Sequence, residues 1–213
     1  PISQHPDLAT CLHNANYPDN AWSLYQHVDL EASTALNTTL GGASAGDVAS
    51  RAAIAAVLRP HVRRQERRPW LASDADEELL LVLRFTSPVC VRKILVIGGG
   101  GEGSNDDEEE LAAYPSRLHC FVNRGEEFDF QSVNDTAATQ VFDLAVNEGE
   151  LLTRISDFSN VTTLALYFPT NNGGSPSTLL RYVGLDGEHT HHRREAVHTV
   201  YELLCVGDHG HFP

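Results

Sequence analysis

From residue 79 onward the chain consists of short apolar and β-branched runs, each of strand length. The runs cover residues 79–85, 89–97, 117–123, 126–131, 139–146, 152–157, 161–168, 179–185 and 197–205. Turn residues separate them, including Thr86-Ser87-Pro88 between the first two runs. Many short strands without helical periodicity between them are typical of an all-β sandwich or jelly roll. The run 161–168 is apolar or β-branched on both faces, which predicts a central strand.

The residues before 79 follow a different pattern. Residues 1–21 are polar and proline-containing, which predicts a poorly ordered lead-in. A short helix is predicted over 29–37, and a second over 48–58, with Asp47 as its N-cap and Pro60 after its end. We therefore expect a jelly-roll-type β-sandwich over 22–206 with short N-terminal helices, and a flexible tail over 207–213.

The charge of the chain is strongly negative and unevenly spread. The formal net charge is −14 over 213 residues, and residues 1–72 contribute none of it. Duplex DNA and anionic membranes attract basic surfaces, so we expect neither as a partner, and we expect a monomer. The one basic patch, Arg59–Arg68, is either a nuclear-localisation or RNA-contacting segment or an exposed connection that neutralises the acidic body.

The cysteines bear on the cellular compartment. None of the four cysteines lies in a C-x-x-C pair, which argues against a zinc knuckle and a thioredoxin-type motif. Cys90, Cys120 and Cys205 sit in apolar runs, where free thiols behave as small hydrophobes. Residues 1–12 lack the basic and apolar regions of a secretory signal. These features predict reduced thiols and a cytoplasmic protein. The basic patch leaves open that the protein is also nuclear.

No catalytic, metal or cofactor site is predicted from the motifs. Gly98–Gly103 fits G-x-G-x-x-G but is followed by consecutive acids at 106–110, which would repel a phosphate. That acidic run lacks the ligand spacing of a calcium site, so we expect a solvated surface loop. His189 and His191 have the spacing of ligands on one strand face, but His192 and His198 add no third ligand with suitable spacing.

The segment 73–78 is rich in polar and acidic residues and directly precedes the first strong strand. Paired carboxylates there are compatible with general acid and base chemistry. Asp and Ser side chains also accept backbone N–H bonds in turns, so a capped turn is the favoured interpretation.

The string 71–80, Leu-Ala-Ser-Asp-Ala-Asp-Glu-Glu-Leu-Leu, resembles the signature of the PITH domain. Other matching pieces follow in order at residues 28–30, 85–89, 94–97, 128–130, 154–161 and 182–188. The resemblance spans about residues 22–190 and is closest to the stand-alone form of the domain. It implies a jelly-roll β-sandwich similar to galactose-binding and DOC-type modules. It also implies association with the regulatory particle of the 26S proteasome, and no enzymatic activity.

These observations lead to one main hypothesis and two alternatives. The main one is a non-catalytic interaction module that docks on regulatory-particle subunits through Ser73, Asp74, Asp76 and Glu77. Because neutral imidazole is a common metal ligand, His209 and His211 in the tail are candidates to reach a partner's groove or metal site. The alternatives are a carbohydrate- or small-ligand-binding jelly roll, and a metal-dependent enzyme built on the histidines at 189–198.

Overall fold

The computed structural model describes residues 22–41, 50–99, 108–125, 127–145 and 149–189. The predicted lead-in, the tail with His209 and His211, the helix cap Asp47 and the strand 197–205 lie outside the described residues. The elements are η1 (Tyr25–His27), β1 (Val28–Leu36), β2 (Thr38–Leu40), α2 (Ser50–Val57), η2 (His61–Arg63), β3 (Leu71–Ser73), β4 (Leu79–Gly98), α3 (Glu108–Ala112), β5 (Arg117–Val122), α4 (Phe130–Asp135), β6 (Gln140–Asp143), β7 (Gly149–Leu152), β8 (Val161–Phe168) and β9 (Leu179–His189).

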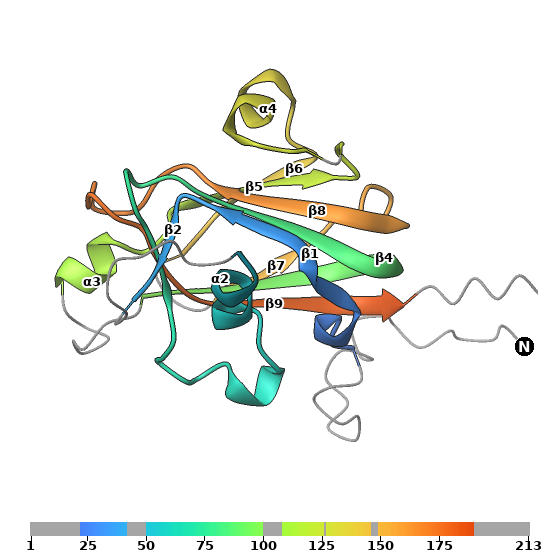
Figure 1. Ribbon diagram of the computed structural model, residues 1–213, viewed down its shortest axis with the longest axis horizontal. Helices are drawn as coiled ribbons and strands as arrows, with labels where there is room; N and C mark the ends of the chain where they lie inside the picture. Colours follow the sequence, from blue (N-terminus) through green and yellow to red (C-terminus); the bar gives the residue numbers. More distant parts are fainter. Residues whose placement is uncertain (1–21, 42–49, 100–107, 126, 146–148, 190–213) are drawn as a thin grey trace, which may run out of the picture.

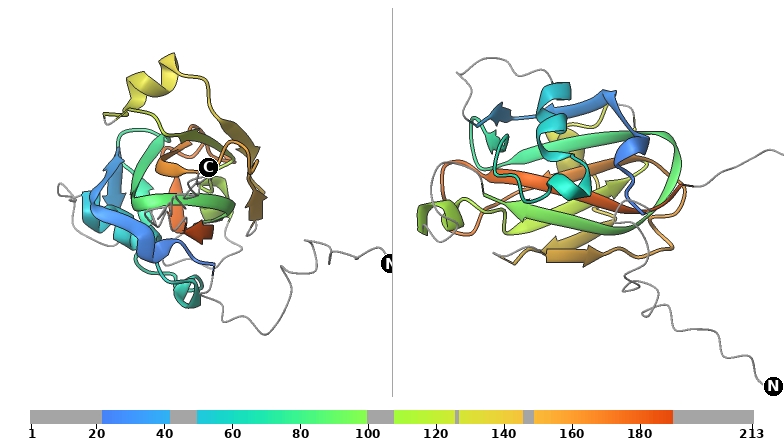
Figure 2. Two further views of the ribbon diagram at one scale, coloured as in Figure 1. Left: turned by 90° about the vertical axis from the view of Figure 1, so that its right-hand side faces the viewer. Right: turned by 90° about the horizontal axis from the view of Figure 1, so that it is seen from below.

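The strands form a jelly-roll-type β-sandwich, which confirms the predicted fold class, and β4 belongs to both of its layers (Figures 1 and 2). Its first half pairs with β1 and β8, and β8 continues through β5 to β6. Its second half pairs with β7 and β9, and β9 continues through β3 to β2. All of these pairings are antiparallel. We call the first set layer A and the second set layer B.

The change of layer occurs between Arg84 and Val89, where the pairing of β4 with β8 shifts register. Pro88 in this stretch has no N–H to donate to a ladder, which suits a position where pairing is interrupted. The turn predicted at residues 86–88 is therefore a bend inside one continuous strand, and the two runs flanking it are its halves.

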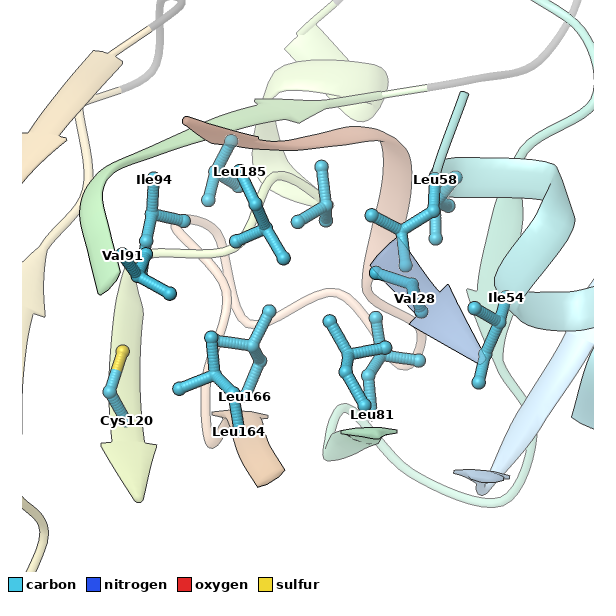
Figure 3. Close-up of a cluster of buried hydrophobic side chains, with 14 of the residues drawn as sticks. Val28, Ile54, Leu58, Leu81, Val91, Ile94, Cys120, Leu164, Leu166 and Leu185 are labelled. Atoms are coloured by element: carbon cyan, nitrogen blue, oxygen red, sulfur yellow. The ribbon is translucent and has the colours of Figure 1, made fainter. Parts of the chain in front are cut away.

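The main core lies between the layers (Figure 3). Because side chains alternate along a strand, Leu81 of β4 points inward with Leu166 of β8, towards Ile94 and Leu185 of layer B. The predicted helix 48–58 appears as α2, whose Ile54 packs into this core beside β1. No helix among the described residues has the length and apolar character needed to cross a bilayer.

The helix predicted over 29–37 is wrong, because this segment forms strand β1. The Oδ1 of Asp29 accepts the N–H groups of Glu31 and Ala32 at 3.0 and 3.1 Å, as a helix-capping side chain does, but no helix follows. The chain nevertheless continues extended, with Leu36 opposite Leu80 of β4. Pairing with β4 thus outweighs a local helical preference that is only a weak bias.

The strand predicted over 126–131 is also wrong. Asp129 caps the short helix α4 by accepting the N–H of Ser132 at 2.8 Å. This segment covers the outer face of layer A, where Phe128 and Val133 pack on β4, β5 and β8 (Figure 1). The strand predicted over 152–157 begins and ends earlier, as β7, because a turn around Arg154 follows it.

Candidate functional site

The acidic turn, residues 73–78, connects β3 to β4 and is held in place by Asn37, which is distant from it in the sequence. Asn37, between β1 and β2, adopts a left-handed conformation with φ 55°. Its Nδ2 donates to Oδ1 of Asp76 at 2.7 Å and to the carbonyl of Glu78 at 2.6 Å. Its Oδ1 accepts the N–H of Ala75 at 2.8 Å. One side chain therefore holds the acidic turn at three points.

The loop before β9 holds the same turn from the other side. The Oγ of Ser73 accepts the N–H of Thr178 at 2.9 Å, and the hydroxyl of Thr178 donates to the carbonyl of Glu77 at 2.6 Å. Ser177 donates its hydroxyl to the carbonyl of Ser73 at 2.7 Å. Since Ser73 is only 3% exposed, its hydroxyl serves the interior of the protein and is not presented to a partner.

The remaining predicted contact residues lie at the surface. Asp74 and Asp76 are exposed, and Glu77 is half-buried. Within the described part of the chain, none of these carboxylates forms an ion pair with an Arg or Lys. Asp76 is already engaged by Asn37, so its carboxylate also has a structural role. The acidic turn thus presents a fixed backbone with carboxylates that the fold itself does not neutralise.

The pKa of Tyr167 on β8 is affected by the negative charges around this turn. Its hydroxyl donates to Oε1 of Glu78 at 2.8 Å. Burial raises the pKa of the Tyr167 phenol above its usual value, and the hydrogen bond to Glu78 and the charges of Glu78, Asp76 and Glu77 raise it further. Several carboxylates therefore act together here, as expected for a surface that attracts basic groups.

The histidine cluster is only partly described. The ring of His189 stacks on that of His27, with centroids 4.2 Å apart, and its Nε2 contacts the hydroxyl of Ser87. This arrangement joins the end of β9 to the start of β1. His191, His192 and His198 lie outside the described residues. Among the residues that the structure describes, no three His, Cys, Asp or Glu side chains are grouped to hold a metal ion.

The basic patch and the acidic run are more structural than predicted. Arg59 is 4% exposed, and its guanidinium donates to the carbonyls of Arg68, Glu66 and Arg181. Burial lowers the pKa of Arg59 below its ordinary value. The interpretation of this arginine as part of an exposed connection is therefore wrong.

In the acidic run, Glu110 lies on α3 and is also buried. It pairs with Arg67 of the basic patch at 3.0 Å. It therefore belongs to the interior and not to a solvated loop, and it fixes α3 against the segment that follows η2.

Two groups important for the acidic turn escaped sequence reasoning. Asn37 stands between the apolar Leu36 and the short run 38–40. Asparagine tolerates a left-handed turn better than most residues, and this is the signal from which a turn at Asn37 could have been predicted. Thr178 gave no comparable signal, because a threonine before a strand is common. Its role depends on contacts more than 100 residues away in the chain, such as that with Ser73 at a separation of 105.

Comparisons with known proteins point to one family. The family model described as PITH domain matches residues 14–204. A protein from Homo sapiens, PITH domain-containing protein 1, is 33% identical over 182 residues, which cover 83% of this chain and 74% of that protein. A protein of the same name from Dictyostelium discoideum is 29% identical over 184 residues, covering 85% and 80%. Neither name describes an enzyme.

A solved structure, the F5/8 type C domain of a protein from Bacteroides fragilis, is similar in form. It is 15% identical, with a TM-score of 0.47, and the match covers 81% of this chain and all of that domain.

Proposed function

The chain belongs to the PITH domain family, and on this basis we propose that it is a non-catalytic protein-interaction module that associates with the regulatory particle of the 26S proteasome. The observation that carries the proposal is the acidic turn, which lies in the signature segment of the family resemblance. Its exposed carboxylates, Asp74 and Asp76, have no ion-pair partner among the described residues. They fit a basic surface on another protein.

The rigidity of the acidic turn favours this role. Ordering a loop on binding costs affinity, and a loop that is already ordered avoids that cost. Asn37 and Thr178 hold the turn from two sides in the free protein. Charges at the rim of an interface mainly raise the association rate, and salt screens them. We therefore expect binding that weakens between low and moderate salt.

The tail is proposed as a second, separate contact. His209 and His211 carry imidazoles that can ligate a metal or donate hydrogen bonds in a partner's groove. Deleting residues 207–213 and finding unchanged affinity for the regulatory particle would exclude this part of the proposal while leaving the acidic turn in place.

The test uses the full chain immobilised on beads with purified regulatory particle, at low and at moderate salt. The variant Asp74→Asn with Glu77→Gln removes two charges and keeps side-chain size. We expect its affinity to fall by about five- to thirtyfold, from roughly 1–2 kcal/mol for two rim charges. The control, Glu127→Gln with Asp135→Asn, removes two exposed charges in the segment around α4 and leaves the acidic turn itself unchanged.

Two results of this binding assay would contradict the proposal. Absence of binding at low salt would overturn the proposal for this protein. Equal weakening by the two double variants would mean that overall charge, and not the acidic turn, drives association.

The carbohydrate-binding alternative has less support. Sugar sites commonly use exposed aromatic rings beside polar groups. Among the described large apolar side chains, Trp22 is the exposed aromatic, at 44%, whereas Trp70 is buried.

A further inference from the structure

Lys93, in the second half of β4, is the only lysine among the 213 residues of the chain. All other side chains that are always positively charged are arginines. A lysine amine is the side-chain group that accepts acetyl groups and ubiquitin, and arginine does not replace it in this chemistry. A modification of this kind on a side-chain amine of these residues must therefore occur at Lys93.

A bulge in β4 sets the direction of the Lys93 side chain. The pairing of β4 with β9 shifts register between Val91 and Lys93, which leaves Arg92 as an extra residue. Val91 and Ile94, on either side, point into the main core. Arg92 and Lys93 both lie outside that core, on the outer face of layer B, where Arg92 pairs with Glu188 at 2.8 Å. Bulges re-aim side chains in this way.

Two carboxylates from the neighbouring strands hold the Lys93 amine. Asp186 of β9 lies directly opposite Lys93, and its Oδ2 is 3.3 Å from Nζ. Glu150 of β7 lies diagonally across from Lys93, and its Oε1 accepts a hydrogen bond from Nζ at 3.0 Å. The Lys93 side chain is only 23% exposed. One ammonium group therefore joins three strands and has a carboxylate on each side.

This environment keeps the amine protonated. Burial lowers the pKa of Lys93, but the hydrogen bond to Glu150 and the charges of Asp186 and Glu150 outweigh burial and raise the pKa above its ordinary value. Reactive lysines in proteins have the opposite property, a lowered pKa that frees the lone pair of the amine for attack on a carbonyl. Lys93 must therefore lose both its proton and its carboxylate partners before it can react.

We propose that Lys93 is a protected acceptor site for acyl transfer, which accepts an acyl group, ubiquitin included, only when Glu150 and Asp186 release its amine. In the reaction with a ubiquitin thioester, the neutral amine attacks the carbonyl carbon and forms an amide bond. The C–S bond breaks, the amine nitrogen loses a proton, and the thiolate leaves. Small acyl donors meet the same restriction.

The protection of Lys93 does not depend on proteasome association, but its use against ubiquitin rests on the proposed function. A chain that stays bound to the proteasome must avoid becoming its substrate. A single lysine held between two carboxylates serves that end, because the folded protein offers no reactive side-chain amine.

The test measures acetylation of the folded full chain by an N-hydroxysuccinimide ester at pH 8, with peptide mapping that separates Lys93 from the amino terminus. The reference is the variant Lys93→Arg with Arg124→Lys, which moves the single lysine to an exposed position in the loop after β5. We expect Lys93 to react about three- to thirtyfold more slowly than the reference lysine, because two ion pairs must break first.

Glu150→Gln with Asp186→Asn removes both carboxylates and keeps side-chain size. It should bring the acetylation rate of Lys93 to within about twofold of the reference, with little change in Tm because such pairs contribute little to stability. The control is Asp143→Asn with Asp157→Asn. It removes two carboxylates that pair with Arg117 and Arg154, and it should leave the rate at Lys93 unchanged.

Equal rates for Lys93 and the reference lysine would overturn the proposal, and so would an unchanged rate in the folded Glu150→Gln, Asp186→Asn variant. The same proteins are then compared in a ubiquitin-conjugating mixture that modifies the reference variant. Transfer to Lys93 at the reference rate would overturn the protection against ubiquitin. None of these assays contains proteasome, so a failure of proteasome binding is recognised separately.

Discussion

Asn37 offers the sharpest test of the idea that the acidic turn is preformed. Replacing it with glycine keeps the left-handed backbone accessible and removes only the side chain. That side chain makes three hydrogen bonds, to Asp76, Glu78 and Ala75. Because the acidic turn is at the surface, each bond contributes near the lower end of the usual 0.5–1.5 kcal/mol. We expect Asn37→Gly to lose about 2 kcal/mol of unfolding free energy.

Asn37→Ala separates the backbone contribution from the side-chain contribution. Alanine removes the same hydrogen bonds but must also adopt the φ of 55°. A left-handed conformation costs a non-glycine residue about 1–2 kcal/mol. Alanine should therefore be less stable than glycine by about 1 kcal/mol, although glycine is normally the more destabilising residue in a folded chain.

The measurement is urea unfolding followed by tryptophan fluorescence, with thermal melts in parallel. A loss of about 2 kcal/mol corresponds to a Tm lower by about 4–8 °C for a domain of this size. Hydrogen exchange at the amide of Ala75, which donates to Asn37, should accelerate in both variants. Wild-type stability of Asn37→Gly would refute the idea that the Asn37 side chain stabilises the acidic turn. Equal stability of the two variants would refute the cost assigned to the left-handed backbone.

Three further predictions rest on single groups. Burial raises the pKa of the Cys120 thiol far above its usual value. In a variant with Cys11→Ser and Cys205→Ser, a thiol reagent should therefore modify the half-buried Cys90 first and Cys120 only on unfolding. Rapid labelling of Cys120 in the folded protein would contradict this prediction. The backbone and hydroxyl of Ser132 lower the pKa of Asp129, so its stabilising effect is present above the unfolded pKa of about 4 and is lost as pH falls through the lowered value. Asp129→Asn should therefore flatten the acid side of the Tm–pH curve, and an unchanged slope in this variant would contradict the assignment. Leu81→Ala removes a fully buried side chain from the main core and should cost about 2–5 kcal/mol in urea unfolding, whereas Val141→Ala, at an exposed position, should cost under about 0.5 kcal/mol.

Strands whose sequence pattern is decided locally were predicted well. Residues 161–168 coincide with β8, because a run that is apolar on both faces has few alternatives to a central strand. The alanine-rich helix 48–58 was found as α2 within two residues at either end. In contrast, residues 29–37 were predicted as a helix, and only their pairing with β4 makes them a strand. Non-local pairing of this kind leaves no local trace.

The candidate sites show the same division. The acidic turn was predicted because its carboxylates are contiguous in the sequence. The side chain that fixes it, Asn37, lies 39 residues before Asp76. Glu110 and Arg59 were assigned to the surface because charged residues are seldom buried, and only the fold supplies the partners that allow their burial.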